Sequence, residues 1–91
     1  MLNKTSETLV TLNTIDKVKA FVNLASTKDF SIDVGSQNGR HCVDGKSIMG
    51  LFSLNLEEPV FVSVPRLKCV PDVVPATDEQ IAEFFEQISK L

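Results

Sequence analysis

The spacing of apolar residues changes its period several times along the chain. Residues 8–12 form a short β-branched run, which is typical of a strand. From Thr14 onward the apolar residues follow a helical period and share one helix face: Val18, Phe21, Val22 and Ala25. Thr14 can cap this helix, because its hydroxyl oxygen can accept a hydrogen bond from a free amide of the first turn. The pattern therefore predicts a strand followed by an amphipathic helix.

A two-residue period comes next, which is the pattern of half-buried strands. Apolar residues here alternate with polar ones: Phe30, Ile32 and Val34. The Asn38-Gly39 pair favours a tight hairpin turn, so residues 40–43 should return as an antiparallel strand. A fourth strand is predicted over residues 60–64, where valine occupies every second position and Pro59 and Pro65 mark the ends.

Two further helices complete the pattern. A short apolar helix should begin near Ser47, with the serine close to its N-cap. The last helix is marked by a capping box at residues 77–80 (TDEQ), ahead of apolar residues at helical spacing: Ile81, Phe84, Phe85, Ile88 and Leu91. The element order β-α-β-β-α-β-α predicts an α+β fold in one domain, residues 1–91, with a four-stranded antiparallel sheet and three helices on one face.

Composition and charge narrow the classes of protein that fit this pattern. Nine basic and 12 acidic residues give a net charge of −3, so no broad basic field is available for nucleic acid or an anionic membrane. No apolar run is long enough to span a bilayer, and the first ten residues lack the apolar core of a signal peptide, so we expect a cytoplasmic protein. The connection 66–76 is long and apolar, which favours a packed cover over a linker.

Residue types that carry catalytic or metal chemistry are few. Cys42 and Cys69 are too few for a disulfide framework and lack the spacing of metal ligands, so each is expected to be reduced and partly buried. His41 is expected at the surface or at a strand edge. Since neighbours on a strand point to opposite faces, His41 and Cys42 do not form a catalytic pair. We therefore expect no enzymatic activity, no cofactor and no metal site.

The predicted helix after Ser47 has more apolar residues than one buried stripe can hold. They are Ile48, Met49, Leu51 and Phe52. Some of them should stay exposed, and adaptable apolar side chains of this kind supply contact area to partner proteins. This helix is the predicted partner-binding surface.

The element order, the Asn-Gly hairpin, the run KSIMGLFSL at residues 46–54 and the valine-rich strand together resemble HPr, the phosphocarrier family of the bacterial phosphotransferase system. By element order the resemblance covers nearly the whole chain. Its specific part is Lys46 to Gly50 with Ser53 and Leu54, which is similar to the regulatory-serine motif of HPr from Gram-positive bacteria. The resemblance implies an open-faced β-sandwich in which HPr kinase/phosphorylase phosphorylates Ser47.

The family's carrier histidine has no counterpart in this chain. The family run resembling G-[IL]-H-A-R-P-A corresponds to residues 13–20 (NTIDKVKA), which have no histidine, no arginine-proline and no glycine. Thr14, Ile15 or Asp16 stands at the histidine's place, and none of them supplies the nitrogen nucleophile of a phosphocarrier. This pattern is similar to that of Crh, the catabolite-repression homologue within the family, in which the active histidine is absent and the regulatory serine is kept.

The resemblance thus implies a non-enzymatic regulator of carbon catabolite control. Its expected partners are HPr kinase/phosphorylase and a catabolite-control transcription regulator, without direct contact to nucleic acid or membrane. The apolar partner face would have a basic border made of Lys17, Lys19 and Lys28, and Lys46, which also belongs to the partner-binding residues, could pair with a phosphate on Ser47. Oligomeric state stays open, because the Crh resemblance also suggests strand exchange.

Two alternatives use the same sequence differently. In the first, the chain is a degenerate HPr-fold interaction module in which Ser47 is only a helix cap and segment 66–76 makes the functional contact. In the second, the embedded order β-α-β-β-α-β forms a small-ligand-binding module of the ferredoxin-like kind. No glycine-rich ligand loop supports the second alternative.

Overall fold

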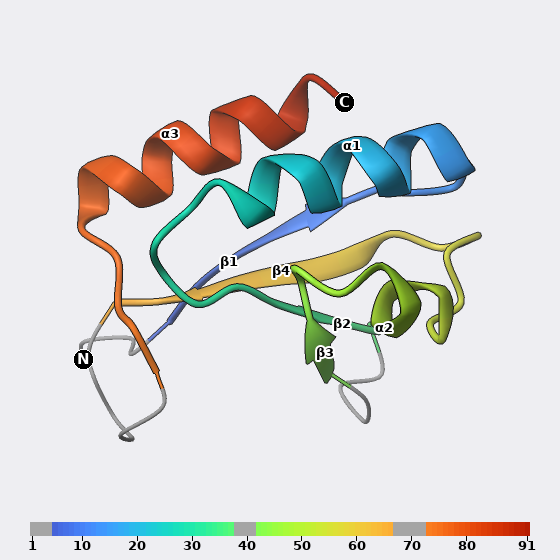
Figure 1. Cartoon of the computed structure of the whole chain (residues 1–91), viewed down its shortest axis with the longest axis horizontal. Helices are drawn as coiled ribbons and strands as arrows, with labels where there is room; N and C mark the ends of the chain where they lie inside the picture. Colours follow the sequence, from blue (N-terminus) through green and yellow to red (C-terminus); the bar gives the residue numbers. More distant parts are fainter. Residues whose placement is uncertain (1–4, 38–41, 67–72) are drawn as a thin grey trace.

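The computed structural model describes residues 5–37, 42–66 and 73–91. Its elements follow the predicted order and are, along the chain, β1 (Thr5–Val10), α1 (Ile15–Ser26), β2 (Asp33–Gly35), β3 (Cys42–Asp44), α2 (Ile48–Phe52), β4 (Val60–Pro65) and α3 (Asp78–Ser89). The strands form one antiparallel sheet in the order β1-β4-β2-β3. The two long helices, α1 and α3, lie side by side on this sheet (Figure 1). The predicted α+β fold is confirmed.

The strands differ from the prediction in their bounds: β3 ends at Asp44 and β4 at Pro65, each one residue later than predicted, and the differences are larger for β1 and β2. β1 begins at Thr5 and ends at Val10, so Leu12 lies beyond the strand, where it is fully buried in the core. β2 covers only residues 33–35, because these are the residues paired with β3 and β4. Phe30 and Ile32 are buried as the alternation indicates, yet they lie before the strand. The predicted turn at residues 38–39 lies outside the described residues.

The strand register places a row of one threonine and three valines across the sheet. Thr8 is opposite Val62, Val62 is opposite Val34, and Val34 is opposite Val43. Paired residues of neighbouring strands point to the same face, and the two central valines of this row are fully buried. The same core contains residues of all three helices, among them Leu51 of α2. The helices therefore pack on one face and leave the other face open.

Three aromatic rings join α1, α3 and the chain before β2. The Phe84 ring of α3 lies 6.1 Å from the Phe21 ring of α1 and 5.9 Å from the Phe30 ring, measured between centroids. The second pair is edge-to-face, a geometry that aromatic quadrupoles favour. Phe84 and Phe21 are fully buried, so this cluster fixes the two long helices relative to each other.

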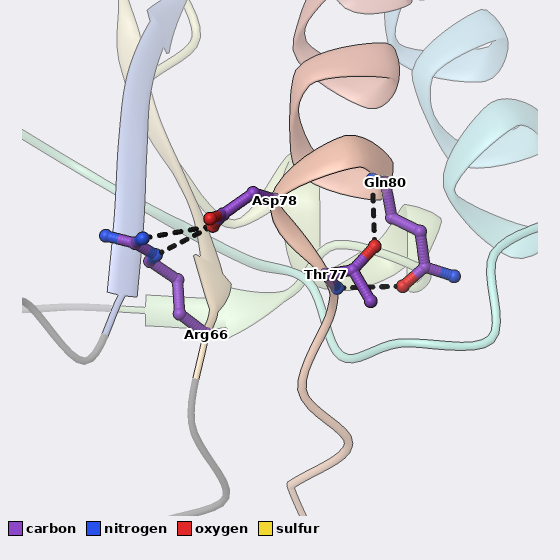
Figure 2. A network of polar contacts seen from close by, with 4 residues as sticks. All are labelled: Arg66, Thr77, Asp78 and Gln80. Atoms are coloured by element: carbon purple, nitrogen blue, oxygen red, sulfur yellow. Dashed lines mark hydrogen bonds and ion pairs between the residues drawn. The ribbon is translucent and has the colours of Figure 1, made fainter.

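Both long helices begin at the predicted caps. Thr14 Oγ1 accepts a 3.1 Å hydrogen bond from the Lys17 amide at the start of α1. At the start of α3, the Thr77 hydroxyl accepts from the Gln80 amide while the Gln80 side chain accepts from the Thr77 amide (Figure 2). This reciprocal pair is the predicted capping box, and it satisfies amides that a helix end would otherwise leave free.

The last part of the connection between β4 and α3 is held against the domain. The Ser31 amide donates to the Val74 carbonyl at 2.9 Å, and the Val74 amide donates to Ser31 Oγ at 3.0 Å. The Ala76 amide donates to the Pro65 carbonyl, and Ala76 is buried. Residues 73–76 are therefore attached to the domain, with Ala76 buried and Val74 50% exposed, while residues 67–72 lie outside the described part of the chain, so the predicted packed cover stays a prediction for most of the segment.

Candidate functional site

A tight turn after β3 places Ser47 at the start of α2. The Gly45 amide donates to the Ile32 carbonyl at 2.8 Å, which docks the turn on the core. Asp44 accepts two hydrogen bonds within this turn. Its carboxylate accepts from the Lys46 amide at 2.9 Å, and its carbonyl accepts from the Ser47 amide at 3.0 Å. The position of Ser47 is thus fixed by β3 and by the core residue Ile32.

Ser47 caps α2 as the sequence indicates. Its Oγ accepts a 3.2 Å hydrogen bond from the Gly50 amide, and its carbonyl accepts from the Leu51 amide at 3.1 Å. Gly50 lies close to β3, because a Cβ built on it would be 3.2 Å from Val43 Cβ and 3.4 Å from Ser47 Oγ. The absence of a side chain at Gly50 therefore leaves the Ser47 hydroxyl uncovered on that side.

The four apolar residues of α2 divide between core and solvent. Met49 is 77% exposed and Phe52 is 45% exposed, as a partner-binding surface requires. Leu51 is fully buried, so its assignment to the partner face was wrong: it belongs to the core. Ile48 is half-buried and packs against the same core.

One exposed apolar residue of α1 was not assigned to this surface. Ile15, the first residue of α1, is 61% exposed. α1 begins toward the same end of the molecule at which α2 lies (Figure 1), and the two helices are in contact. The sequence carried no signal for this exposure, because Ile15 stands three residues before Val18 and seven before Val22 and so continues the apolar spacing of α1. We define the docking surface as Ile15, Met49 and Phe52.

The lysines expected around this surface are distributed over both ends of α1. Lys17 and Lys19 lie in its first turns. The Lys46 ammonium instead donates to the Lys28 carbonyl at 2.8 Å, beyond the other end of the helix. Lys28 Nζ donates to Gln87 Oε1 of α3 at 2.8 Å. The assignment of Lys28 to the basic border was therefore wrong, and Lys46 has a structural contact of its own.

Comparison with known proteins shows which known fold this structure has. No protein-family model matches the chain, and no curated protein matches its sequence. Among solved structures, the crystal structure of a phosphocarrier protein HPr from Bacillus anthracis str. Ames is similar, with a TM-score of 0.62 and 18% sequence identity. The match covers 97% of this chain and 96% of the HPr chain. This chain has the HPr fold.

In this HPr-fold chain, the resemblance places the carrier position at the start of α1. Thr14 is the N-cap there, and its hydroxyl already accepts from the Lys17 amide. Ile15 and Asp16 follow and are exposed. A phosphocarrier needs a nitrogen nucleophile, and these three residues have none in their side chains. His41 lies outside the described residues.

The open face of the HPr-fold sheet has polar residues that the sequence pattern did not single out. Asp33 and Asp44 are register partners of β2 and β3 on that face. Burial, and then the charge of Asp44, raise the pKa of Asp33 above its ordinary value of 3.8. Cys42 is a free thiol and is exposed, so the expectation of partial burial was wrong: it lies on edge strand β3. Cys69 lies outside the described residues.

Neither a metal-binding cluster nor a membrane-spanning helix is found in the described part of the HPr fold. In residues 5–37, 42–66 and 73–91, no group of three or more His, Cys, Asp or Glu side chains is arranged to hold a metal ion. Over the same ranges, no helix has the length and apolar character needed to cross a membrane.

Proposed function

We propose that this chain is a non-enzymatic regulatory protein of the HPr/Crh type that accepts a phosphoryl group on Ser47 and has no histidine carrier activity. One observation carries the proposal: Ser47 caps α2 within the motif KSIMG, and exposed Met49 and Phe52 follow it on an HPr fold. A phosphorylatable hydroxyl therefore stands directly beside an exposed apolar surface.

The local contacts of Ser47 suit a phosphoryl acceptor. Phosphorylation adds a charge of about −1.5 to −2 and three strong acceptor oxygens. The Gly50 amide, which now donates to Ser47 Oγ, is placed to donate to a phosphate oxygen instead. A Cβ on Gly50 would lie only 3.4 Å from Ser47 Oγ, so glycine at this position keeps a methyl group away from the hydroxyl. The fold can thus accept the modification while the charge beside Met49 and Phe52 changes.

The charge change would act on a partner at the docking surface. An apolar surface of Ile15, Met49 and Phe52 offers contact area, and a phosphate at Ser47 would add an anion beside it. Lys17 and Lys19 are the basic residues left to border this surface. Lys46 would first have to leave the Lys28 carbonyl, so we assign it no part in holding the phosphate.

By resemblance, the partners proposed for this surface are HPr kinase/phosphorylase and a catabolite-control transcription regulator. The setting would be carbon catabolite regulation in the bacterial cytoplasm. The start of α1 supports the absence of carrier transfer, because the side chains of Thr14, Ile15 and Asp16 offer no nitrogen nucleophile. The proposal involves no cofactor.

Intact-mass spectrometry tests this proposal directly. The protein is incubated with ATP and HPr kinase/phosphorylase, and in a second arm with phosphoenolpyruvate and enzyme I. We expect the mass of one phosphate from ATP and none from phosphoenolpyruvate. Ser47→Ala should abolish the uptake, whereas Ser53→Ala, a matched change at the other end of α2, should keep it.

A second function has its own observation in its favour. The cap geometry of Ser47 is complete without any modification, since its oxygen accepts from the Gly50 amide. No uptake in either arm would refute the phosphorylation proposal and favour an HPr-fold interaction module in which Ser47 is only a cap. Phosphate taken from phosphoenolpyruvate would refute the claim that carrier activity is absent.

A further inference from the structure

A groove runs between strand β1 and helix α3, away from Ser47 and α2. It has a volume of about 800 Å³. Its lining comes from β1, from the residue after β4 and from α3, and includes Ser6, Glu7, Arg66, Asp78, Ala82 and Phe85. α3 lies on the β1 side of the sheet, away from β2 and β3 (Figure 1), and contacts β1.

The β1 wall of this groove is the edge of the sheet. Among residues 5–37, 42–66 and 73–91, β1 pairs with β4 on one side only, so its other side presents backbone amides and carbonyls that an added strand can use. The strand is six residues long, TSETLV, and contains neither proline nor lysine, two residues that commonly protect sheet edges. An extended peptide can therefore continue the sheet here, a recognised mode of peptide binding.

The opposite wall is an apolar stripe of α3. Ile81, Ala82 and Phe85 line the groove at helical spacing. Ile81 is buried and Phe85 is half-buried, while Ala82 is exposed and small. A side chain that enters the groove from a strand added to β1 would pack on Ala82 and Phe85.

The register of β1 defines which side chains such a peptide needs. Ser6 and Thr8 are opposite the buried residues Val64 and Val62, so they lie on the face covered by the helices. Residues paired with Ser6 and Thr8 would therefore point toward α3 and should be apolar. The residue paired with Glu7 would point to the open face.

Charge determines the residue type opposite Glu7. At the end of the groove, Arg66 Nη2 lies 3.0 Å from Asp78 Oδ1, and Figure 2 shows this pair bridging the end of β4 and the start of α3. Arg66 and Asp78 neutralise each other, so the net charge of −1 of the groove lining comes from Glu7, at the rim of the groove on the open face of β1. A basic side chain directly opposite Glu7 forms a favourable cross-strand pair.

We propose that the edge of β1 and the face of α3 form a binding site for an extended peptide segment of a partner protein, with alternating apolar and basic residues. The peptide adds a fifth strand to the sheet, its apolar side chains pack on Ala82 and Phe85, and a lysine or arginine pairs with Glu7. This surface is separate from the docking surface of Ile15, Met49 and Phe52, so the inference does not rest on phosphorylation of Ser47.

The test uses a fluorescein-labelled peptide of three alternating valine-lysine pairs and its valine-glutamate counterpart. Fluorescence anisotropy measures affinity, and ¹⁵N–¹H correlation spectra map the site. Wild-type protein should bind the lysine peptide, with shifts concentrated at residues 5–10 and 81–85. Glu7→Lys should weaken the lysine peptide about tenfold and strengthen the glutamate peptide, because one cross-strand pair changes from attraction to repulsion.

Two further variants separate this site from general charge attraction. Glu58→Lys makes the same charge change at an exposed residue before β4 and should leave both affinities nearly unchanged. Ala82→Gln adds bulk without charge at an exposed position of α3 and should weaken both peptides. The folded state of each variant is checked by its own spectrum.

Several results would overturn the proposal. They are no binding of the lysine peptide at about 1 mM, shifts centred on α2, or equal losses in Glu7→Lys and Glu58→Lys. Sedimentation of the free protein gives a further check: if a second copy already occupies the β1 edge, the protein sediments as a dimer and the peptide assignment is wrong.

Discussion

Gly45 and Ile32 lie so close together that no side chain fits between them. The Gly45 amide donates to the Ile32 carbonyl at 2.8 Å, and a Cβ built on Gly45 would be 2.6 Å from Ile32 Cγ2 and 3.1 Å from the Ile32 carbonyl oxygen. Ile32 is 1% exposed and belongs to the core. The turn that positions Ser47 is therefore attached to the core through a glycine.

Gly45→Ala should destabilise the protein, because the new methyl group overlaps a buried side chain and its backbone. We expect a loss of about 2 kcal/mol in the free energy of unfolding, the range for an overpacked site, and a melting temperature roughly 10 °C lower. Urea and thermal unfolding measure both quantities. In an Ile32→Leu background, which removes the β-branched methyl group, the same change should cost less; an equal cost would show that this methyl is not the obstacle.

Ser47→Ala should weaken α2 even without phosphorylation, because the Gly50 amide loses its acceptor. The expected loss is about 1 kcal/mol, typical of a helix N-cap. Ser47→Asp retains a side-chain acceptor and should stay close to wild type. Urea unfolding of the three proteins compares them, and equal losses in the alanine and aspartate variants would contradict the cap role.

Thr77→Ala should destabilise the start of α3. The substitution removes the oxygen that accepts from the Gln80 amide, at an expected cost of about 1 kcal/mol, whereas Thr77→Ser keeps this acceptor. Hydrogen exchange of the Gln80 amide reports the change locally. Exchange as slow in Thr77→Ala as in wild type would show that the capping box does not protect this amide.

The two long helices were predictable because their signals are local. Thr14 and Thr77 are caps that act on amides three residues away, and a helix of 12 residues repeats its apolar period often enough to define the buried face. The predicted fold followed from the order of such elements. The serine at the head of α2 was predictable for the same reason.

The remaining features depend on contacts between distant parts of the chain. α2 has only five residues, too few turns for the sequence to show that Leu51 is the buried one. The partner of Lys46 is a carbonyl 18 residues earlier in the chain. The groove beside β1 exists because α3 packs next to a strand more than 60 positions away, and no local pattern contains that information.

Asp33→Asn should stabilise the protein at neutral pH and have no such effect near pH 3. Burial and the charge of Asp44 raise the pKa of Asp33, so the folded state holds this proton more tightly than the unfolded chain does. Stability is therefore unaffected below pH 3.8, falls as the pH rises through the folded-state pKa, and stays reduced above it. Asparagine removes this penalty.

The gain should be small, because the Asp33 carboxyl is only partly desolvated by its neighbours while much of the residue stays exposed, and solvent screens its repulsion with Asp44. Thermal unfolding at pH 3 and pH 7 measures it, with Asp29→Asn as a control of equal charge at another exposed position. Asp44→Asn keeps an acceptor for the Lys46 amide and should lower the pKa of Asp33 in an NMR titration, since it removes the second cause of the shift. An unchanged titration of Asp33 would mean that burial alone raises its pKa and that the facing carboxylates of β2 and β3 do not interact.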